Sequence, residues 1–291
     1  MPINNAVSIE EFRGIAVDSE DGERWLLIAD THVGLEVELG KKGVRIPSQS
    51  ARIAQLVLDF AEGTGGATSL AILGDIKHEI ASIVDSAREV RNFLNRVSGR
   101  FNKVVLVKGN HDGNLDLVLS SDAKSNIYLV DSRGFMIRSK DGKNLLLLHG
   151  NSKPRVEDFV NADVIIMGHT HPAILIQDVT GYVMRAPVIV KIRVDKSVFG
   201  KNMYNTEVGA TGSTNIIVLP TFNPLTVGMD VFEIFPKDLV EVETILHYAR
   251  TWEILSNIEV YLTDMTYLGT MDILARIREE TGEGGYDFDW L

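Results

Sequence analysis

Six of the seven histidines in this chain of 291 residues lie in five short motifs, and each motif follows directly on an apolar run. The motifs combine imidazole, carboxylate and amide groups, which are the nitrogen and oxygen donors that divalent metal ions use. The carboxyl ends of strands line the ligand crevice of an open α/β sheet, so five buried strands could deliver these donors to one place. The sequence therefore predicts a two-metal site. The motifs are Asp30-Thr31-His32, Gly74-Asp75-Ile76-Lys77-His78, Gly109-Asn110-His111-Asp112, His149-Gly150 and Gly168-His169-Thr170-His171.

The donor types indicate how two ions could be shared. Asp75 carries two carboxylate oxygens and can bridge two cations, whereas the neutral amide of Asn110 limits negative charge near an anionic substrate. The chain has no cysteine, which excludes thiolate ligands. A single histidine after a strand is more often a structural residue, but desolvating all five motifs without a ligand would cost several kcal/mol. We expect Mn²⁺ at the site, with Fe²⁺, Zn²⁺ or Mg²⁺ as alternatives.

Composition limits the classes of protein that fit. Hydrophobic residues make up 45% of the chain and charged residues 24%, as in ordinary globular proteins. No apolar stretch approaches the ~20 residues that span a bilayer, and the first residues lack the features of a secretory signal. We therefore expect a cytoplasmic protein without a membrane partner. A net charge of -11 disfavours tight, non-specific binding to DNA but does not exclude a phosphate substrate.

The first part of the chain predicts alternating strands and helices, as in βαβ units. Residues 14–17 and 24–29 predict a pair of strands, and residues 33–50 predict a loop. Apolar side chains recur at helical spacing within residues 50–61 and 82–97, which is typical of amphipathic helices.

Beyond His171 the sequence predicts a second layer of sheet, because β-branched residues dominate and helical signals are few. The expected elements are strands at residues 174–177, 182–194 and 215–219, strand-and-turn surface at 191–201, a helix at 237–256 and a hairpin of 258–262 with 267–268.

The motif series resembles the calcineurin-like metallophosphoesterases, whose pattern runs DxH, GDxx(D/N/H), GNH(D/E), H and GHxH. The histidine of GDIKHE resembles the nuclease subunits of double-strand-break repair complexes and a group of small prokaryotic phosphoesterases related to them. The segments LGKKGVRIPSQ, IIVLPTFNPL and VYLTDMTYLGT resemble that small group specifically. The resemblance covers about residues 10–275.

The resemblance implies an α/β (α+β) fold, a four-layer α/β/β/α sandwich of two mixed sheets flanked by helices. Residues 1–275 would form one metallophosphoesterase domain, which includes the second-layer strands, the C-terminal helix and the hairpin. Residues 276–291 lie outside the resemblance and form an acidic aromatic tail by composition, which predicts either a frayed end or a contact for a protein partner.

The resemblance also implies a role for each motif residue. Seven side chains would hold the two ions: Asp30, His32 and His171 the first, Asn110, His149 and His169 the second, and Asp75 both. His111 would face the substrate as an acid and stabilise the transition state, and His78 or Asp112 would orient it.

Two cations in such a site would bind phosphate oxygens and lower the pKa of a shared water, whose hydroxide would attack phosphorus opposite the leaving group. We therefore expect a two-metal-dependent hydrolase of phosphodiester bonds in nucleic acids or (cyclic) nucleotides. A phosphomonoesterase or protein phosphatase is the alternative enzyme, and an inactive scaffold of the same fold is the alternative without catalysis.

Overall fold

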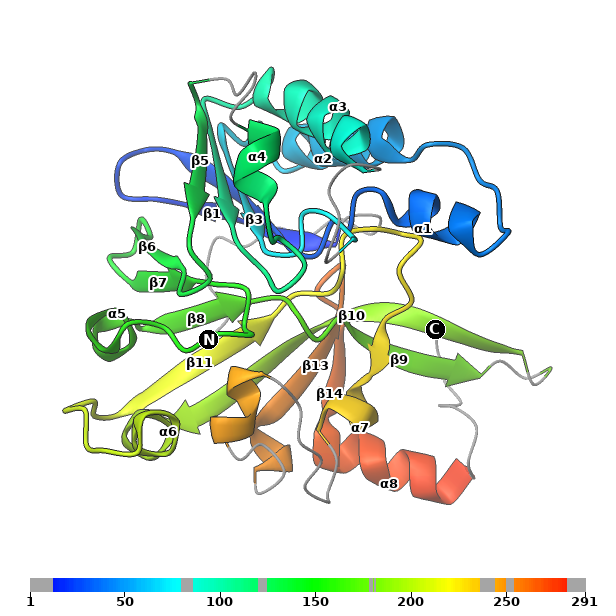
Figure 1. Ribbon diagram of the computed structural model, residues 1–291. Helices are drawn as coiled ribbons and strands as arrows, with labels where there is room; N and C mark the ends of the chain where they lie inside the picture. The colour runs from blue at the N-terminus through cyan, green and yellow to red at the C-terminus, as the bar shows by residue number, and fades with distance from the viewer. Residues whose placement is uncertain are drawn as a thin grey trace.

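The structure is a computed structural model, which describes residues 13–79, 86–119, 125–177, 180, 182–235, 244–249 and 254–281. Two β-sheets face each other, and helices cover the outer face of each sheet (Figure 1). This is the four-layer arrangement that the resemblance implies.

Five strands form the first sheet: β1 (Gly14–Asp18), β2 (Arg24–Ile28), β3 (Ser69–Leu73), β4 (Lys103–Val107) and β5 (Ile127–Val130). They lie in this order across the sheet, with β1 antiparallel to β2 and the other neighbours parallel. The predicted pair of strands at residues 14–17 and 24–29 is therefore confirmed. All residues of β3 are buried, because a central strand of a parallel sheet is covered on both faces.

Three helices pack on the outer face of this sheet: α2 (Ser50–Gly63), α3 (Ala87–Ser98) and α4 (Leu115–Leu119). α2 buries Ile53, Val57 and Phe60 in the same core as the strands, which confirms the helix predicted at residues 50–61. The helix predicted at residues 82–97 is helical from Ala87 onward, and its first residues lie outside the described ones.

Nine strands form the second sheet: β6 (Phe135–Arg138), β7 (Asn144–Leu147), β8 (Val164–Met167), β9 (Pro172–Gln177), β10 (Val183–Asp195), β11 (Ser213–Val218), β12 (Met229–Asp230), β13 (Ile258–Leu262) and β14 (Tyr267–Thr270). The order is β12-β9-β10-β11-β8-β7-β6, and β13 pairs with both β10 and β14. β8 runs parallel to β7 and β11. The predicted second layer and its closing antiparallel hairpin, β13 with β14, are thus present.

The outer face of the second sheet is covered by short helices: α5 (Val156–Asn161), α6 (Lys196–Tyr204), α7 (Val231–Ile234), α8 (Met271–Thr281) and the 3-10 helices η1 (Ile245–Ala249) and η3 (Leu255–Asn257). The α-helix predicted at residues 237–256 is wrong in its described parts, which are η1 and η3; the rest lies outside the described residues. The spacing of apolar residues predicts which face of a helical segment is buried, but it does not distinguish an α-helix from short 3-10 helices. The expected domain boundary after residue 275 falls inside α8, and residues 282–291 lie outside the described ones.

Two further helices replace predicted irregular segments. Helix α1 (Leu35–Lys41) lies within the predicted loop of residues 33–50, where the side chain of Glu36 is buried and accepts a hydrogen bond from the backbone N–H of Gln49 at 2.9 Å. Helix α6 replaces the strand-and-turn surface expected after β10. It begins there because the carboxylate of Asp195 accepts the first free N–H groups of the helix, including that of Ser197 at 2.9 Å.

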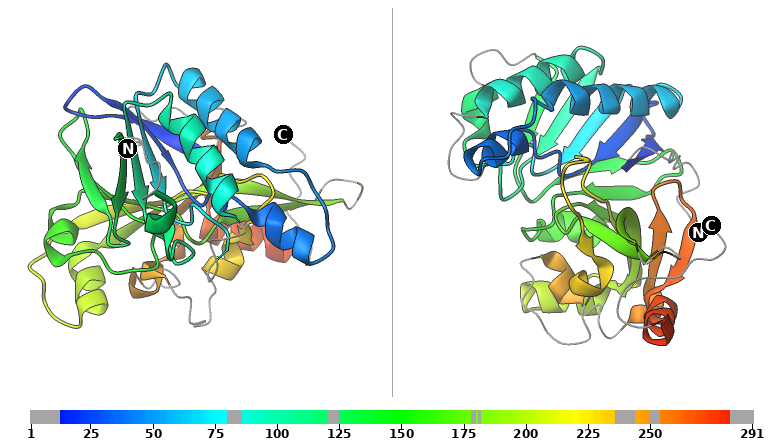
Figure 2. Two further views of the ribbon diagram at one scale, coloured as in Figure 1. Left: turned by 45° about the horizontal axis from the view of Figure 1, so that its top comes forward. Right: turned by 90° about the vertical axis from the view of Figure 1, so that its right-hand side faces the viewer.

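Alternating side chains of the first sheet divide between two cores. Leu26 and Leu70 face α2 and α3, whereas Leu27 and Ala71 point to the opposite side and pack with Leu147 and other residues of the second sheet. A third core fills the space between the second sheet and its helices. The side view in Figure 2 shows these layers stacked, with α2 and α3 on one side and α8 on the other.

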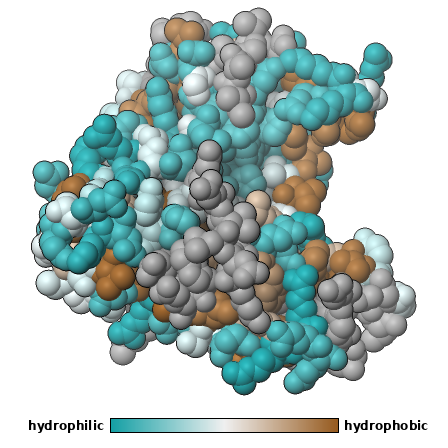
Figure 3. Space-filling model, turned by 60° about the horizontal axis from the view of Figure 1, so that its bottom comes forward, coloured by the Kyte–Doolittle hydropathy of each residue, from teal (hydrophilic) through white to brown (hydrophobic). Residues whose placement is uncertain are grey.

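The face seen in Figure 3 is mostly hydrophilic, and its hydrophobic side chains form separate patches. Among the described residues, no helix combines the length and the apolar character needed to cross a bilayer.

Candidate metal centre

The five motifs converge because each follows the carboxyl end of a strand. Strands β2, β3 and β4 of the first sheet lead to Asp30, Asp75 and Asn110, and strands β7 and β8 of the second sheet lead to His149 and His169. In four of the five cases the donor lies two residues beyond the last strand residue. The two sheets therefore contribute to one site where their strand ends meet.

The first group of donors contains Asp30, His32, Asp75 and His171, whose ligand atoms all lie within 4.8 Å of one another. Nε2 of His32 lies 3.2 Å from Nε2 of His171 and 3.7 Å from Oδ2 of Asp75. Oδ1 of Asp30 lies 3.4 Å from Nε2 of His171. These are the residues predicted for the first ion, together with the predicted bridge.

The second group contains Asp75, His149 and His169. Nε2 of His149 lies 3.4 Å from Oδ1 of Asp75, 3.0 Å from Nδ1 of His169 and 3.1 Å from Oδ1 of Asn110. Asp75 thus presents Oδ2 to the first group and Oδ1 to the second. A carboxylate placed in this way can bridge two cations.

The donor set fits two divalent cations. Oδ1 of Asp30 is buried and has no hydrogen-bond partner among the described residues, which is costly unless a ligand satisfies it. Nδ1 of His149 lies 3.0 Å from the carbonyl oxygen of Leu73. If Nδ1 carries the hydrogen and donates it to this carbonyl, Nε2 is unprotonated and faces the second group. Ligation of a metal ion by imidazole requires such an unprotonated nitrogen.

Glycines surround the ligands where no larger residue would fit. A Cβ on Gly74 would lie 2.1 Å from Nδ1 of His149, and one on Gly168 would lie 2.4 Å from Oδ2 of Asp30. A Cβ on Gly109 would lie 2.2 Å from Oδ1 of Asp75. The glycines of the motifs are therefore required for the close approach of backbone to ligand side chains.

The ligand backbones are strained. Eight non-glycine residues of the described chain have positive φ, and five of them are predicted ligands: Asp30, His32, Asp75, His169 and His171. Such conformations are uncommon outside glycine and concentrate at functional sites. Neighbouring segments hold them in place, because the N–H of His32 donates to the carbonyl of Asp75 at 2.8 Å and the hydroxyl of Thr221 donates to the carbonyl of Asp30 at 2.8 Å.

Asp30 and Asp75 lie close together in the centre, and their pKa values shift in opposite directions. Burial would raise the pKa of Asp30, but the neighbouring imidazoles, His171 first, hold it below its usual range. Burial, reinforced by the charge of Asp30, raises the pKa of Asp75. Burial lowers the pKa values of His32 and His149, whereas the carboxylate of Asp30 outweighs burial at His171 and raises its pKa. Cations at this site would therefore compete with protons on Asp75 and His171.

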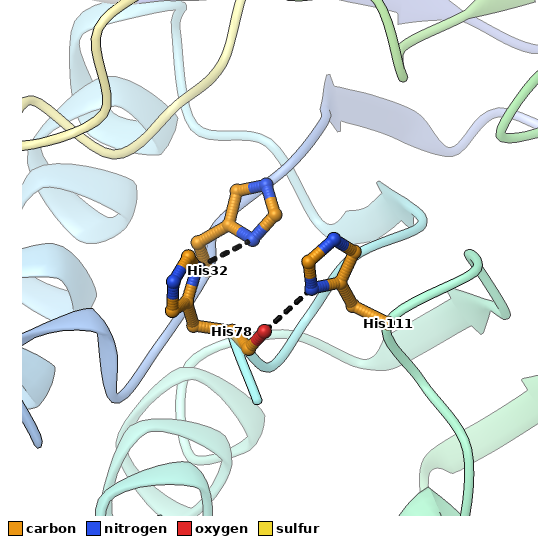
Figure 4. A group of neighbouring side chains, drawn as sticks. All are labelled: His32, His78 and His111. Carbon is orange, nitrogen blue, oxygen red and sulfur yellow. Dashed lines mark hydrogen bonds between the residues drawn. The ribbon is translucent and has the colours of Figure 1, made fainter. Parts of the chain in front are cut away.

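His111 lies at the more accessible side of the centre. Its side chain is 21% exposed, whereas that of Asp75 is 4% exposed, and its Nε2 lies 3.8 Å from Oδ2 of Asp75. The backbone N–H of His111 donates to Oδ1 of Asp75 at 2.9 Å. The ring is held by Nδ1, which lies 2.5 Å from the carbonyl oxygen of His78 (Figure 4).

Asp112 and His78 take different positions around His111. The carboxylate of Asp112 is buried and accepts hydrogen bonds from the backbone N–H groups of Gly109 at 2.9 Å and of Ile76 and Lys77 at 3.2 Å each. Asp112 thus ties the two ligand-bearing loops together. Of the two residues predicted to orient His111, His78 contacts its ring. The contacts are made by the carbonyl of His78 and by its own ring, which stacks on that of His111 with centroids 5.7 Å apart.

The sequence interpretation missed two residues that support the centre. Nδ2 of Asn223, a fully buried side chain, donates to the carbonyls of Thr31 and His32 at 3.0 and 3.2 Å. Glu38 of α1 reaches His78, with Oε2 2.9 Å from Nε2. Asn223 lies in the segment IIVLPTFNPL, whose resemblance to the small phosphoesterases was a signal for it. Glu38 lies in the segment predicted as a loop, where no sequence signal pointed to it.

The fold and the paired donor groups define an α/β sandwich protein with a two-metal ligand set. The sequence model described as "calcineurin-like phosphoesterase superfamily domain" matches residues 24–189, more than half of the chain and all seven predicted ligands. The chain belongs to this superfamily of metal-dependent phosphoesterases, as the motif series indicated.

The chain is also similar to solved structures, one of which comes from Aquifex aeolicus. The crystal structure of the protein of unknown function AQ665 from Aquifex aeolicus is similar to this chain with a TM-score of 0.33 and 21% sequence identity, over 50% of this chain and 78% of that one. No curated protein matches the chain.

Proposed function

We propose that this protein hydrolyses phosphodiester bonds in nucleic acids or (cyclic) nucleotides, with Mn²⁺ as its preferred metal. The observation that carries the proposal is the sharing of Asp75 between two donor groups, with an accessible imidazole, His111, beside the shared carboxylate. Two bound divalent cations would supply Lewis acidity and a hydroxide nucleophile at neutral pH.

The remaining chemistry falls to the chain's own residues. His111 is held through Nδ1, so Nε2 is the atom that can reach a substrate oxygen. An imidazole can donate a proton near neutral pH and is therefore suited to protonate a departing alkoxide. Asp75 accepts the backbone N–H of His111 and thereby fixes the position of this ring relative to the shared carboxylate.

A diester fits the charges around the site better than a monoester. A phosphate monoester is largely a dianion at neutral pH, since its second pKa is ~6, whereas a diester carries one negative charge. Imidazoles lie beside the centre, and burial lowers the pKa of His78, which favours the neutral form of this ring. The histidine of GDIKHE also matches the nuclease-like members of the superfamily.

Parallel hydrolysis assays would test the proposal. Metal-replete protein should cleave bis-p-nitrophenyl phosphate and single-stranded DNA, RNA or 2′,3′-cyclic nucleotides with Mn²⁺ present, and should cleave p-nitrophenyl phosphate more slowly. The control is Asp75→Ala, which should lose at least one metal by elemental analysis and all of these activities. Faster cleavage of the monoester would assign a phosphomonoesterase instead, and inertness of a metal-replete preparation toward every phosphodiester would assign a scaffold.

A further inference from the structure

A chain of polar contacts connects helix α1 to the first donor group. Oε2 of Glu38 lies 2.9 Å from Nε2 of His78, and Nδ1 of His78 lies 3.3 Å from Nδ1 of His32. The opposite nitrogen of His32, Nε2, faces His171 and Asp75. Exposure falls along the chain, because the side chains of Glu38, His78 and His32 are 33%, 19% and 4% exposed. Figure 4 shows the His78 and His32 rings turned toward each other.

The positions of the hydrogens follow from the donors and acceptors in this chain. A carboxylate only accepts, so Nε2 of His78 must donate its N–H to Glu38. A neutral His78 then has an unprotonated Nδ1, which can only accept. The hydrogen bond between the two rings therefore requires an N–H on Nδ1 of His32. Nε2 of His32 is then unprotonated, and its lone pair is directed at the first donor group, 3.2 Å from Nε2 of His171.

We propose that Glu38 is a positioning residue that fixes the tautomer of His78 and, through it, the tautomer of His32 that can bind a metal ion. Ligating histidines commonly donate their second N–H to a carboxylate or carbonyl. Here the acceptor for His32 is another imidazole, and the carboxylate lies one residue further out. This role of Glu38 concerns the metal centre alone, and it would hold whichever phosphoester is the substrate.

The contacts of α1 hold Glu38 in place for this role. The two carboxylate oxygens of Glu38 have different partners: Oε1 pairs with Lys42 at 2.5 Å, and Oε2 contacts His78. A second ion pair, Lys41 with Glu79 at 2.5 Å, joins α1 to the residue after His78. The Lys41–Glu79 ion pair thus joins the helix to the segment of His78, next to the contact between Glu38 and His78.

The tautomers can be measured directly in the wild-type, metal-free protein. Long-range ¹H–¹⁵N correlation spectra of ¹⁵N-histidine-labelled protein distinguish protonated from unprotonated ring nitrogens. We expect His32 to carry its hydrogen on Nδ1 and His78 to carry its hydrogen on Nε2. A hydrogen on Nε2 of His32 in this spectrum would overturn the proposal, and this measurement needs no variant to fold.

The variant Glu38→Gln tests the same point by binding. Its amide can donate as well as accept, so it no longer selects one tautomer of His78. We expect Mn²⁺ affinity at the site containing His32 to fall about 10- to 100-fold, with both tautomers of His32 visible in the spectrum. The matched control is Glu79→Gln, which removes a carboxylate from the same attachment of α1 without touching an imidazole, and it should bind Mn²⁺ within twofold of wild type.

The outcomes separate this inference from the proposed function. Unchanged Mn²⁺ affinity in Glu38→Gln would overturn the positioning role, but it would not contradict the proposed phosphodiesterase function. Equal losses in Glu38→Gln and Glu79→Gln would overturn it too, because the effect would then come from the attachment of α1. His32, His78 and His111 also form a group able to hold an ion, and a third equivalent of Mn²⁺ bound by His78 would refute the proposal. A protein that binds Mn²⁺ as expected but cleaves no diester would contradict only the function.

Discussion

Replacing Gly109 by alanine should damage the metal centre although it adds a single methyl group. The new Cβ would lie 2.2 Å from Oδ1 of Asp75, 2.5 Å from the backbone nitrogen of Asp75 and 2.9 Å from Nε2 of His149. Ordinary non-bonded contacts between heavy atoms lie near about 3.5 Å, so the closest overlap is about 1.3 Å. Neither neighbour can withdraw, because His149 is fully buried and the side chain of Asp75 is 4% exposed.

The size of the effect follows from this overlap. Forcing an extra methyl group into a packed interior costs about 1–3 kcal/mol, and a displacement of about 1 Å at a catalytic centre can reduce the rate about 100-fold. We expect Gly109→Ala to melt several degrees lower than wild type and to bind Mn²⁺ at least tenfold more weakly. Hydrolysis should fall by about two orders of magnitude.

Three measurements and one control complete the experiment: thermal unfolding, Mn²⁺ titration by calorimetry and hydrolysis of bis-p-nitrophenyl phosphate. The control is Gly40→Ala at the end of α1, where a Cβ would meet no atom within 4 Å. Alanine favours a helix over glycine by up to about 1 kcal/mol, so Gly40→Ala should retain metal affinity and stability. Wild-type metal affinity in Gly109→Ala would show that the donors are not packed as described, and the reasoning would fail.

Three more perturbations address other parts of the centre. His111→Ala should keep the metal stoichiometry in elemental analysis yet lose about 10²–10⁴-fold in turnover; loss of metal would count against its place on the substrate side. Mn²⁺ affinity should rise between pH 6 and 8, because the raised pKa values of Asp75 and His171 mean that protons compete with the cation at the acidic end; calorimetry in two buffers should detect proton release, and a flat profile would contradict this. Asn223→Ala removes the side-chain donor to the carbonyl of Thr31 and one of the two donors to the carbonyl of His32, which keeps the N–H of Leu35. The variant should lower the free energy of unfolding by about 1–3 kcal/mol, as urea denaturation would measure; a change below about 0.5 kcal/mol would mean that water replaces the amide.

Much of the fold could be predicted because periodicity reports burial. The continuous runs of buried residues in β1 and β2 and the helical spacing of Ile53, Val57 and Phe60 in α2 are local properties of the chain. Helix α1 could not be predicted in this way. Its stability depends on contacts of Glu36 with Gln49 and of Glu38 with His78, partners that lie outside the helix.

The sequence by itself determined which donors the chain offers and that each follows a strand, because residue type and apolar runs are written into it directly. Only the tertiary structure decided how those donors are used: that each oxygen of Asp75 faces a different group, that five ligands adopt positive φ, and that His78 holds His111 by its carbonyl. The physical reason is the range of the interactions. Ring orientation and backbone strain at a ligand are set by hydrogen bonds between segments tens of residues apart, such as His32 with His78 and Asn223 with the loop of His32, and no local pattern records them.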